Sequence, residues 1–386
     1  MKVLVVAEYY PRANDPVLGI WAHRQALAAR DAGAEVRVLV LHRPLPALRS
    51  LRKLDLAAAR RALAQPRSEQ RDGLRVDYVR YLSPPRPWSY GSWGAWAAPV
   101  LKRALPRIAR DFRFDLVHAH YAVPAGDAVR RSVPWSPLVV SVHGGDVHGR
   151  HSGGSAVRAA LSHARLVLAN SAGTARRCEA LGALQTRVVH LGADLPGAEP
   201  PKPARPTLVS VGHLVARKRH ADVITALPAL RDRHPEIRYV VVGDGPEREA
   251  LGELARRLGV SDQVQFRGEL GHAPAVAAAQ GATVFVLPSV AEAFGVSYIE
   301  AMAGGVPAIG CRGEDGPEEI AAAGGGIELV APCDPSAIAA ATEALLSTPA
   351  RLQQLGREAR QTVERSFTWE RCGHDTVAAY EDVLSK

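Results

Sequence analysis

Short apolar runs alternate with helix-like segments along most of this chain, and no other feature constrains its fold as tightly. The first example runs from an apolar stretch at residues 3–6, through a segment of helical periodicity at 21–32, to a second apolar stretch at 36–41. Gly33 ends the helical segment. Such alternation indicates an α/β protein with a parallel sheet and helices on both faces. Further buried-strand candidates follow at residues 116–118, 139–142, 166–169 and 188–189.

A proline-rich stretch divides this pattern into two halves. Residues 196–206 read PGAEPPKPARP, which can continue neither a helix nor a central strand. A second series of strand candidates follows it, each leading into a glycine-containing turn and a helix. Two doubly wound domains in tandem bind ligands at the carboxyl ends of their strands. We therefore expect a first domain over residues 1–195, a linker over 196–206, a second domain over 207–367 and a C-terminal helix over 368–386.

The composition is that of a globular protein. With 386 residues, 47% of them hydrophobic and 23% charged, the chain can bury a core in each of two domains. The opening MKVLVV is not followed by an extended apolar core with a cleavage site. No later stretch approaches the roughly 20 apolar residues that span a bilayer. We expect a cytoplasmic protein.

The formal charge of +9 includes a concentrated basic stretch at residues 43–86. It contains the amphipathic run LRSLRKLDLAAARRAL and is followed by Trp88, Trp93 and Trp96. Two interpretations stay open: a membrane-surface element that would give peripheral contact with the anionic inner membrane face, or a solvated helix lying on the first domain. Nucleic acid is not an expected partner, because the stretch lacks regularly interleaved aromatic residues.

The segment at residues 284–309, VFVLPSVAEAFGVSYIEAMAGGVPAI, carries the strongest functional signal. It predicts a buried strand, a loop that carries Glu292, a helix that carries Glu300, and another strand. Backbone N–H groups at the helix start have no helical partner and suit an anion such as a diphosphate. A carboxylate accepts two hydrogen bonds at once, as ribose hydroxyls require. We expect the groups of this segment that bind the diphosphate and the ribose of a nucleotide donor at Phe294, Gly295, Val296 and Glu300.

Together with its flanking PSxxExFG and EAMAxGxPxI patterns, the segment resembles the EX7E signature of the retaining glycosyltransferases of family four. The resemblance extends over LVSVGHLVARKR, VVVGDGPERE and VQFRGEL in the second half, DLVHAHYAVPAG and PLVVSVHGGDV in the first, and SFTWERC near the end. It implies the GT-B fold, in which two Rossmann-like domains face each other across a cleft and a C-terminal helix crosses back to the first domain. It also implies that Glu300 holds the nucleotide ribose and that Glu292 holds hydroxyls of the donor sugar.

The loop at residues 212–219 brings Arg217 and Lys218 to the end of a predicted strand. A departing diphosphate gains negative charge there, and fixed cations stabilise that charge best where water is scarce. Members of the family that this chain resembles usually have an arginine directly after the first glycine of this loop, whereas this chain has His213. We expect Lys218 to act in catalysis, and either Arg217 or His213 to replace the missing arginine at the donor phosphates.

In the first domain, an apolar strand runs into His143 and Asp146 with two glycines between them. The glycines permit close approach, and polar side chains at a strand end face the ligand crevice. The resemblance implies that His143 sits beside the donor sugar as a catalytic residue and that Gly19 lies at the donor diphosphate. The expected acceptor-side residues are His118, His120 and Asp146.

No metal or cofactor is expected. His118 and His120 share one face of a strand, but no third ligand is apparent. The sequence has no D-x-D motif, and its four cysteines lack the spacing of a zinc site or a disulfide framework.

These features predict a metal-independent, retaining transfer of a sugar from a nucleotide-diphosphate donor, UDP- or GDP-linked, to a glycan or lipid-linked acceptor, as in polysaccharide biosynthesis. Neither a general base nor a nucleophilic carboxylate is identifiable, so a front-face substitution is the hypothesis. Two alternatives stay open. One is a donor-binding protein with little turnover, which His213 motivates; the other is a nucleotide-sugar epimerase or a phosphorylase on the same fold.

Overall fold

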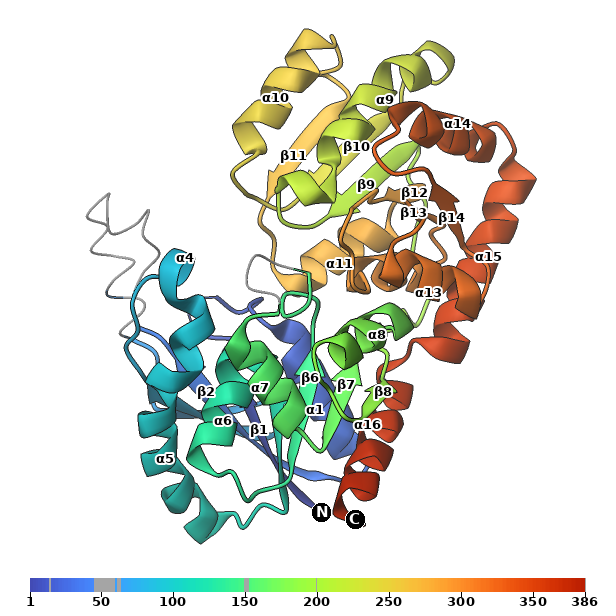
Figure 1. Cartoon of the computed structure of the whole chain (residues 1–386). Coiled ribbons are helices and arrows are strands. Elements are labelled where there is room, and N and C mark those ends of the chain that lie inside the picture. The colour runs from blue at the N-terminus through green and yellow to red at the C-terminus, as the bar shows by residue number, and fades with distance from the viewer. Residues whose placement is uncertain (14, 45–59, 61–63, 149–152, 199, 386) are drawn as a thin grey trace. The chain divides into compact units, whose positions relative to one another are not determined.

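The structure is a computed structural model that describes the whole chain except residues 14, 45–59, 61–63, 149–152, 199 and 386 (Figure 1). The chain forms two compact units. The first unit comprises Met1–Leu191 and Trp369–Lys386, and the second unit comprises Gly192–Thr368.

The first unit is built on an eight-stranded sheet with the order β3-β4-β2-β1-β5-β6-β7-β8. All neighbours pair in parallel except β3 and β4, which are antiparallel. Its strands are β1 (Lys2–Ala7), β2 (Glu35–His42), β3 (Ser68–Arg71), β4 (Leu74–Arg80), β5 (Leu116–His120), β6 (Leu138–Val142), β7 (Leu166–Ala169) and β8 (Thr186–Val188). Its helices are α1 (Ile20–Asp31), α4 (Arg86–Ser89), η1 (Tyr90–Ser92), α5 (Trp93–Asp111), η2 (Ala122–Gly126), α6 (Asp127–Ser132), α7 (Ser155–His163), α8 (Ala172–Ala180) and α16 (Trp369–Leu384).

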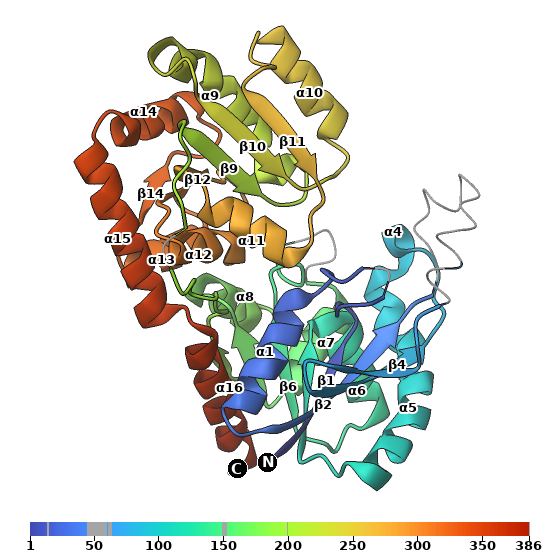
Figure 2. The same ribbon diagram turned by 180° about the vertical axis from the view of Figure 1, so that it is seen from behind.

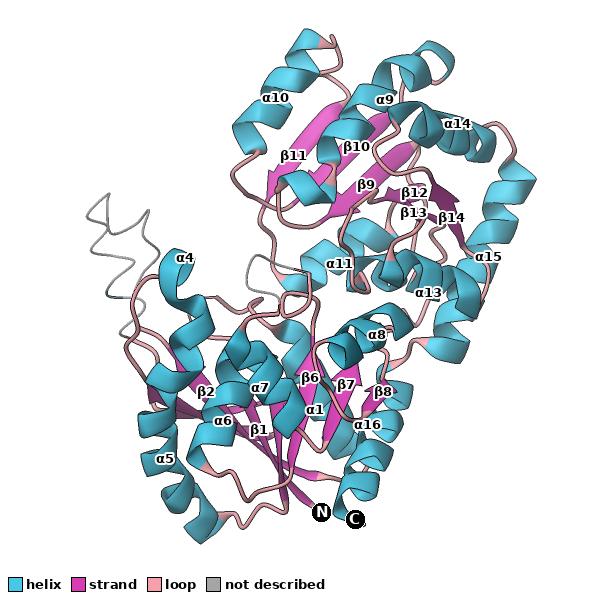
Figure 3. Cartoon of the chain, in the orientation of Figure 1, coloured by secondary structure: helices cyan, strands magenta, loops and turns pink. Residues whose placement is uncertain are grey.

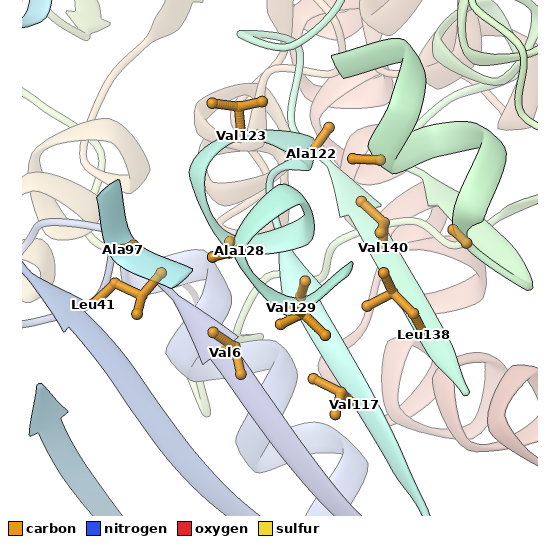
Figure 4. Close-up of a cluster of buried hydrophobic side chains, with 14 of the residues drawn as sticks. Val6, Leu41, Ala97, Val117, Ala122, Val123, Ala128, Val129, Leu138 and Val140 are labelled. Atoms are coloured by element: carbon orange, nitrogen blue, oxygen red, sulfur yellow. The ribbon is translucent and has the colours of Figure 1, made fainter. Parts of the chain in front are cut away.

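Helices cover both faces of this sheet (Figure 3). Successive side chains of a strand point to opposite faces, so β1 contributes to two cores. Val6 packs with Leu41 and Ala97 of α5 in one core, which the close-up in Figure 4 shows. Val5 packs on the other face, in the core to which α1 and α16 contribute.

The C-terminal helix α16 belongs to the first unit because it packs closely on α1. A Cβ added at Gly373 would lie 2.2 Å from the carbonyl oxygen of Ala28. The amide of Gln25 also donates a hydrogen bond of 3.1 Å to Thr376. Figure 2 shows the two helices from behind, side by side.

The second unit is built on a six-stranded parallel sheet with the order β11-β10-β9-β12-β13-β14. Its strands are β9 (Thr207–Val211), β10 (Arg238–Val242), β11 (Val264–Gly268), β12 (Val284–Val286), β13 (Ala308–Cys311) and β14 (Ile327–Val330). Its helices are η3 (Ala216–Lys218), α9 (His220–Arg233), α10 (Arg248–Arg257), α11 (His272–Gln280), α12 (Val296–Ala303), α13 (Asp315–Ala323), α14 (Pro335–Leu346) and α15 (Pro349–Ser366).

The proline-rich stretch at residues 196–206 lies along the second unit. The ammonium of Lys202 donates to the carbonyl oxygens of Gly304 and Gly305, at 3.3 and 3.1 Å. The guanidinium of Arg360 donates to the carbonyl oxygen of Pro196.

The expected fold, two α/β domains with a C-terminal helix that returns to the first domain, is confirmed, and the structure places this helix against α1. The interpretation of residues 43–86 as a helical element is wrong for residues 68–80, which form the hairpin of β3 and β4. Asp72 and Gly73 make its turn with φ values of 49° and 80°, as two-residue hairpin turns require. The amphipathic run that begins at residue 48 lies almost wholly outside the described residues.

The three tryptophans that follow this stretch are not equivalent. Trp88 and Trp96 are exposed, but Trp93 is only 3% exposed and packs in the core. The expectation that Trp93 is available to a membrane surface is therefore wrong. Within the described part of the chain, no helix combines the length and the apolar character needed to span a bilayer.

Candidate active site

The loop that follows β9 lies at the centre of the second sheet, where the strand order reverses, and ligands bind at such points in open α/β sheets. The turn after β10 packs directly against this loop. A Cβ added at Gly243 would lie 2.0 Å from the carbonyl oxygen of Gly212, and one at Gly245 would lie 2.4 Å from that of Leu214. The two glycines of the GDGP turn therefore serve to hold the loop in place.

The loop ends in a short helical turn that buries Lys218. Its side chain is 11% exposed, and its ammonium forms an ion pair with the carboxylate of Glu292. Arg217 reaches the same carboxylate oxygen at 3.9 Å, but its side chain is half-exposed. His213 is exposed at the other end of the loop. Lys218 is thus the cation that the fold holds most firmly here.

Glu292 is the buried centre of this group of residues. Its carboxylate accepts a 2.7 Å hydrogen bond from the hydroxyl of Ser289, and its backbone N–H donates to the carboxylate of Glu314 at 2.9 Å. Burial alone would raise the pKa of Glu292, but the charge and hydrogen bond of Lys218, helped by Ser289 and Arg217, bring it below its ordinary value. Glu292 is therefore an ionised acceptor of hydrogen bonds at neutral pH.

Helix α12 begins at Val296, after a glycine, Gly295, at its N-cap. Gly295 adopts a φ of 84°, and its neighbour Phe294 buries its ring against Phe367 at 5.7 Å. A Cβ at Gly316 would lie 2.1 Å from the carbonyl oxygen of Phe294, so the start of α13 packs tightly on this turn. The Phe294 ring lies in the core, and Gly295 and Val296 stand at the start of α12, where backbone N–H groups lack helical partners and can bind a ligand.

Glu300 lies one turn further along α12 and has a different partner. Its carboxylate Oε1 lies 2.8 Å from Nε2 of His272, at the start of α11, and its side chain is 15% exposed. Gln280 of α11 also donates to the backbone carbonyl of Glu300. The neighbouring helix therefore fixes the orientation of the Glu300 carboxylate.

Three histidines form a row at the ends of β5 and β6 in the first unit, in which the rings of His118 and His120 lie 4.5 Å apart. His120 and His143 stack with an interplanar angle of 5° and share a 2.9 Å hydrogen bond. His118 contacts the hydroxyls of Tyr380 and Ser141, each at 2.7 Å. Burial lowers the pKa of His118 and of His143 to about 3, and it lowers that of His120 well below its ordinary value. The row is therefore neutral in the folded protein.

This row predicts loss of stability in acid. The pKa of a histidine in the unfolded chain is 6.5, while the folded values for His118 and His143 are about 3. Protons therefore favour the unfolded chain below pH 6.5, and stability that is complete above this value is lost as the pH falls towards 3. Each histidine contributes a slope of about 1.4 kcal/mol per pH unit in that window. The variant His143→Asn should show a correspondingly shallower slope.

Urea unfolding between pH 7.5 and 4.5, followed by tryptophan fluorescence, measures this effect in the first unit alone. All six tryptophans belong to it, from Trp21 to Trp369. Equal slopes for the wild type and for His143→Asn would contradict the assignment.

Gly19 and Asp146 also lie at this edge of the first sheet. Gly19 has a φ of 64°, and a Cβ there would lie 2.2 Å from the carbonyl of Tyr9, so only glycine allows α1 to start at this place. Asp146 accepts a 3.0 Å hydrogen bond from the N–H of Ala122. Burial raises the pKa of Asp146 to about 7, although backbone N–H groups oppose this shift. Asp146 also lines a cavity of about 270 Å³ together with Tyr90 and Ser155.

Among the described residues, no group of three or more His, Cys, Asp or Glu side chains could hold a metal ion. All four cysteines are free thiols.

The structure brings Arg217, Lys218 and Glu292 together in the second unit and gives Glu300 a separate partner in the same unit. It places the histidines in a row of their own in the first unit, where His118 is occupied by contacts with Tyr380 and Ser141. Sequence reasoning missed the residues that orient these groups, because no local pattern marks contacts between distant elements. The missed residues are Ser289, Glu314, Gly316 and His272.

The matches to known protein families extend over most of the chain. The family "Glycosyltransferase Family 4" matches residues 18–196, and "Glycosyl transferases group 1" matches residues 195–362. Glycogen synthase of Mycobacterium tuberculosis is 28% identical over 412 residues, covering 98% of this chain and 94% of that protein. The GDP-mannose-dependent alpha-(1-6)-phosphatidylinositol monomannoside mannosyltransferase of the same organism is 33% identical over 182 residues, which is 45% of this chain and 46% of that protein.

The fold has known counterparts as well. The solved structure of sucrose-phosphate synthase from Thermosynechococcus elongatus superposes with a TM-score of 0.79 at 20% identity and covers 100% of both chains. With both halves matched, the chain belongs to glycosyltransferase family 4 and is a GT-B glycosyltransferase that depends on a nucleotide sugar.

Proposed function

We propose that this enzyme transfers a sugar from a UDP- or GDP-sugar to a hydroxyl of a glycan or lipid-linked acceptor, with retention of configuration and without a metal ion. The observation that carries the proposal is the buried pair of Lys218 and Glu292 at the switch point of the second sheet. A buried lysine has three donors and needs only one of them for Glu292. Its remaining N–H groups can bind the donor diphosphate.

In this proposal the charge of the leaving group is balanced by the protein. Lys218, Arg217 and the free N–H groups at the start of α12 face the developing diphosphate, where preorganised donors are most effective. Glu292 accepts hydrogen bonds from hydroxyls of the donor sugar, and Glu300 accepts them from the ribose. His143 and Gly19 act on the donor from the first unit, and His120 and Asp146 lie on the acceptor side.

The proposed reaction is a front-face substitution. The bond between the anomeric carbon and the diphosphate oxygen breaks, and the acceptor oxygen bonds to that carbon from the same side. The departing phosphate oxygen takes the proton of the acceptor hydroxyl. Lys218 stabilises this oxygen until the proton arrives.

A panel of UDP- and GDP-sugars tests the donor. Specific binding raises the midpoint of thermal unfolding by mass action. The donor with the preferred base and sugar should therefore give the largest increase in this midpoint. Release of nucleoside diphosphate from that donor must then be measured in the presence of EDTA. Tight donor binding without release of nucleoside diphosphate would favour a second candidate function, a donor-binding protein with little turnover. The observation that favours this candidate is the exposed His213, which stands in place of the usual arginine.

We also propose that the first unit contacts anionic membranes through α4 and α5. Trp88 is 77% exposed and Trp96 is 51% exposed. The outward side of α5 continues with basic residues, and such a combination suits the interface of an anionic bilayer. These exposed basic residues are Lys102, Arg103, Arg107 and Arg110.

Replacing Trp88 and Trp96 together with alanine should weaken binding to vesicles of phosphatidylglycerol and phosphatidylcholine by about tenfold or more, because two interfacial rings are lost. Cosedimentation measures the binding. Trp135→Ala is the matched control, since Trp135 is also 77% exposed but lies outside both helices. Equal loss in the control, or no loss in the double variant, would rule out this surface.

A further inference from the structure

Three arginines gather around one buried carboxyl group in the first unit. Glu8 directly follows β1, and Arg43 directly follows the neighbouring strand β2. Arg12 lies in the loop after β1, and Arg86 begins α4. The charges of all three guanidinium groups act on the carboxyl of Glu8. The group lies at the carboxyl edge of the two strands, where α/β sheets bind ligands.

Neutral partners hold each of these arginines in place. Arg12 donates to the backbone carbonyl of Glu8 at 2.5 Å. Arg43 donates to the hydroxyl and the carbonyl of Ser83, at 3.0 and 3.2 Å, and lies over the ring of Trp93. Arg86 lies 4.4 Å from the ring centroid of Tyr90. Hydrogen bonds and ring stacking of this kind orient a guanidinium without neutralising it.

In the described part of the chain, none of these three arginines makes an ion pair with a carboxylate within 4.0 Å. Other arginines of this protein do, such as Arg37 with Asp77 and Arg219 with Asp222, both at 2.7–2.8 Å. Arg12 Nε is moreover buried without a hydrogen-bond partner among the described residues. Clustered guanidinium groups repel one another, so this arrangement calls for an anion.

Glu8 does not supply enough negative charge. It is 6% exposed, and its Oε2 has no hydrogen-bond partner among the described residues. Burial raises the pKa of Glu8 to about 7 even against the opposing charges of Arg12, Arg86 and Arg43. Three guanidinium charges therefore face at most one carboxylate charge.

We infer that Arg12, Arg43 and Arg86 form an anion-binding site for a phosphate or carboxylate group of the acceptor. The planar guanidinium fork matches either oxyanion with two parallel hydrogen bonds. The inference rests on the proposed function in one respect, which is that the acceptor binds to the first unit. A soluble phosphorylated sugar and a phospholipid headgroup would both present this chemistry.

Titration with inorganic phosphate tests the site directly. The full-length protein carries Lys218→Ala throughout, so that the donor site of the second unit contributes little to phosphate binding. Calorimetry should detect phosphate binding that Arg86→Gln weakens about tenfold, since one charged hydrogen-bond donor pair is lost. Arg176→Gln removes an equal charge from the exposed side of α8 and should leave the affinity unchanged.

The triple variant with glutamine at all three positions should bind no phosphate. Absence of phosphate binding in the Lys218→Ala protein, or equal affinity in Arg86→Gln, would overturn the inference. Because Arg86 is exposed, this single variant keeps the test valid if the triple variant fails to fold. The readout is independent of sugar transfer, so failure here leaves the proposed function untouched.

A second arm identifies the source of the anion. If phosphate binds, loss of cosedimentation with phosphatidylglycerol vesicles in Arg86→Gln assigns the site to a lipid headgroup. Unchanged cosedimentation assigns it to the phosphate or carboxylate of a soluble acceptor. Both results are consistent with an anion-binding site at these arginines.

Discussion

Replacing Lys218 with methionine is expected to lower the rate constant of sugar transfer by about 10²- to 10³-fold, because the leaving diphosphate loses its buried cation. Methionine keeps the apolar stem of the side chain and removes only the charge. The effect should appear in kcat, since the charge on the departing oxygen develops in the transition state. Single-turnover release of nucleoside diphosphate measures it.

Arg217→Gln is the matched control for this prediction. Arg217 reaches the same oxygen of Glu292 at 3.9 Å, but its side chain is 50% exposed, so solvent screens its charge. Its loss should cost about tenfold or less. If Lys218→Met folds and retains at least a third of the wild-type rate, Lys218 does not stabilise the leaving group.

Replacing Glu300 with alanine is expected to weaken donor binding by about 10- to 100-fold while kcat changes little. A carboxylate that binds ribose hydroxyls does so in the ground state and the transition state alike, so its loss raises KM. A donor with a 2′,3′-dideoxyribose should bind the wild type and Glu300→Ala equally weakly. Strong discrimination between ribose and dideoxyribose by Glu300→Ala would contradict the role.

The orientation of Glu300 offers a finer test through His272. Removing this partner in His272→Ala should raise the donor KM in the same direction as Glu300→Ala, and His272→Gln should restore part of the affinity with its amide donor. His234, directly after α9, and Glu343 of α14 form a comparable pair at 2.9 Å. His234→Ala is therefore the control and should leave KM unchanged.

The sequence predicted the sheets well because burial leaves a local trace. Residues 36–41 and 139–142 are apolar throughout or nearly so, as strands covered on both faces must be. The hairpin of β3 and β4 was not predicted, because the surrounding basic residues favoured a helical interpretation. Its Asp72–Gly73 turn, flanked by extended residues, was the signal that could have revealed it.

The candidate site was predictable only in part, for a physical reason. Lys218, Glu292 and Glu300 stand in loops and turns whose composition reflects their chemistry. Their partners belong to other elements, and only folding brings them close: His272 lies 28 positions from Glu300. The burial of Trp93 is likewise a tertiary property.

The arginines around Glu8 show the same limit. Arg12, Arg43 and Arg86 are far apart in sequence, and each alone reads as an ordinary surface residue. The parallel pairing of β1 with β2 brings the ends of these strands together, and only then do the arginines share one carboxyl group.

The anomeric configuration of the bond formed with the acceptor tests the central claim most directly. Proton NMR of the glycoside formed from the accepted α-linked nucleotide sugar, in EDTA, distinguishes the two anomers. A front-face substitution at Lys218 and Glu292 predicts the α-anomer, formed at an undiminished rate in EDTA. The β-anomer, or a reaction that EDTA abolishes, would contradict a retaining, metal-independent mechanism.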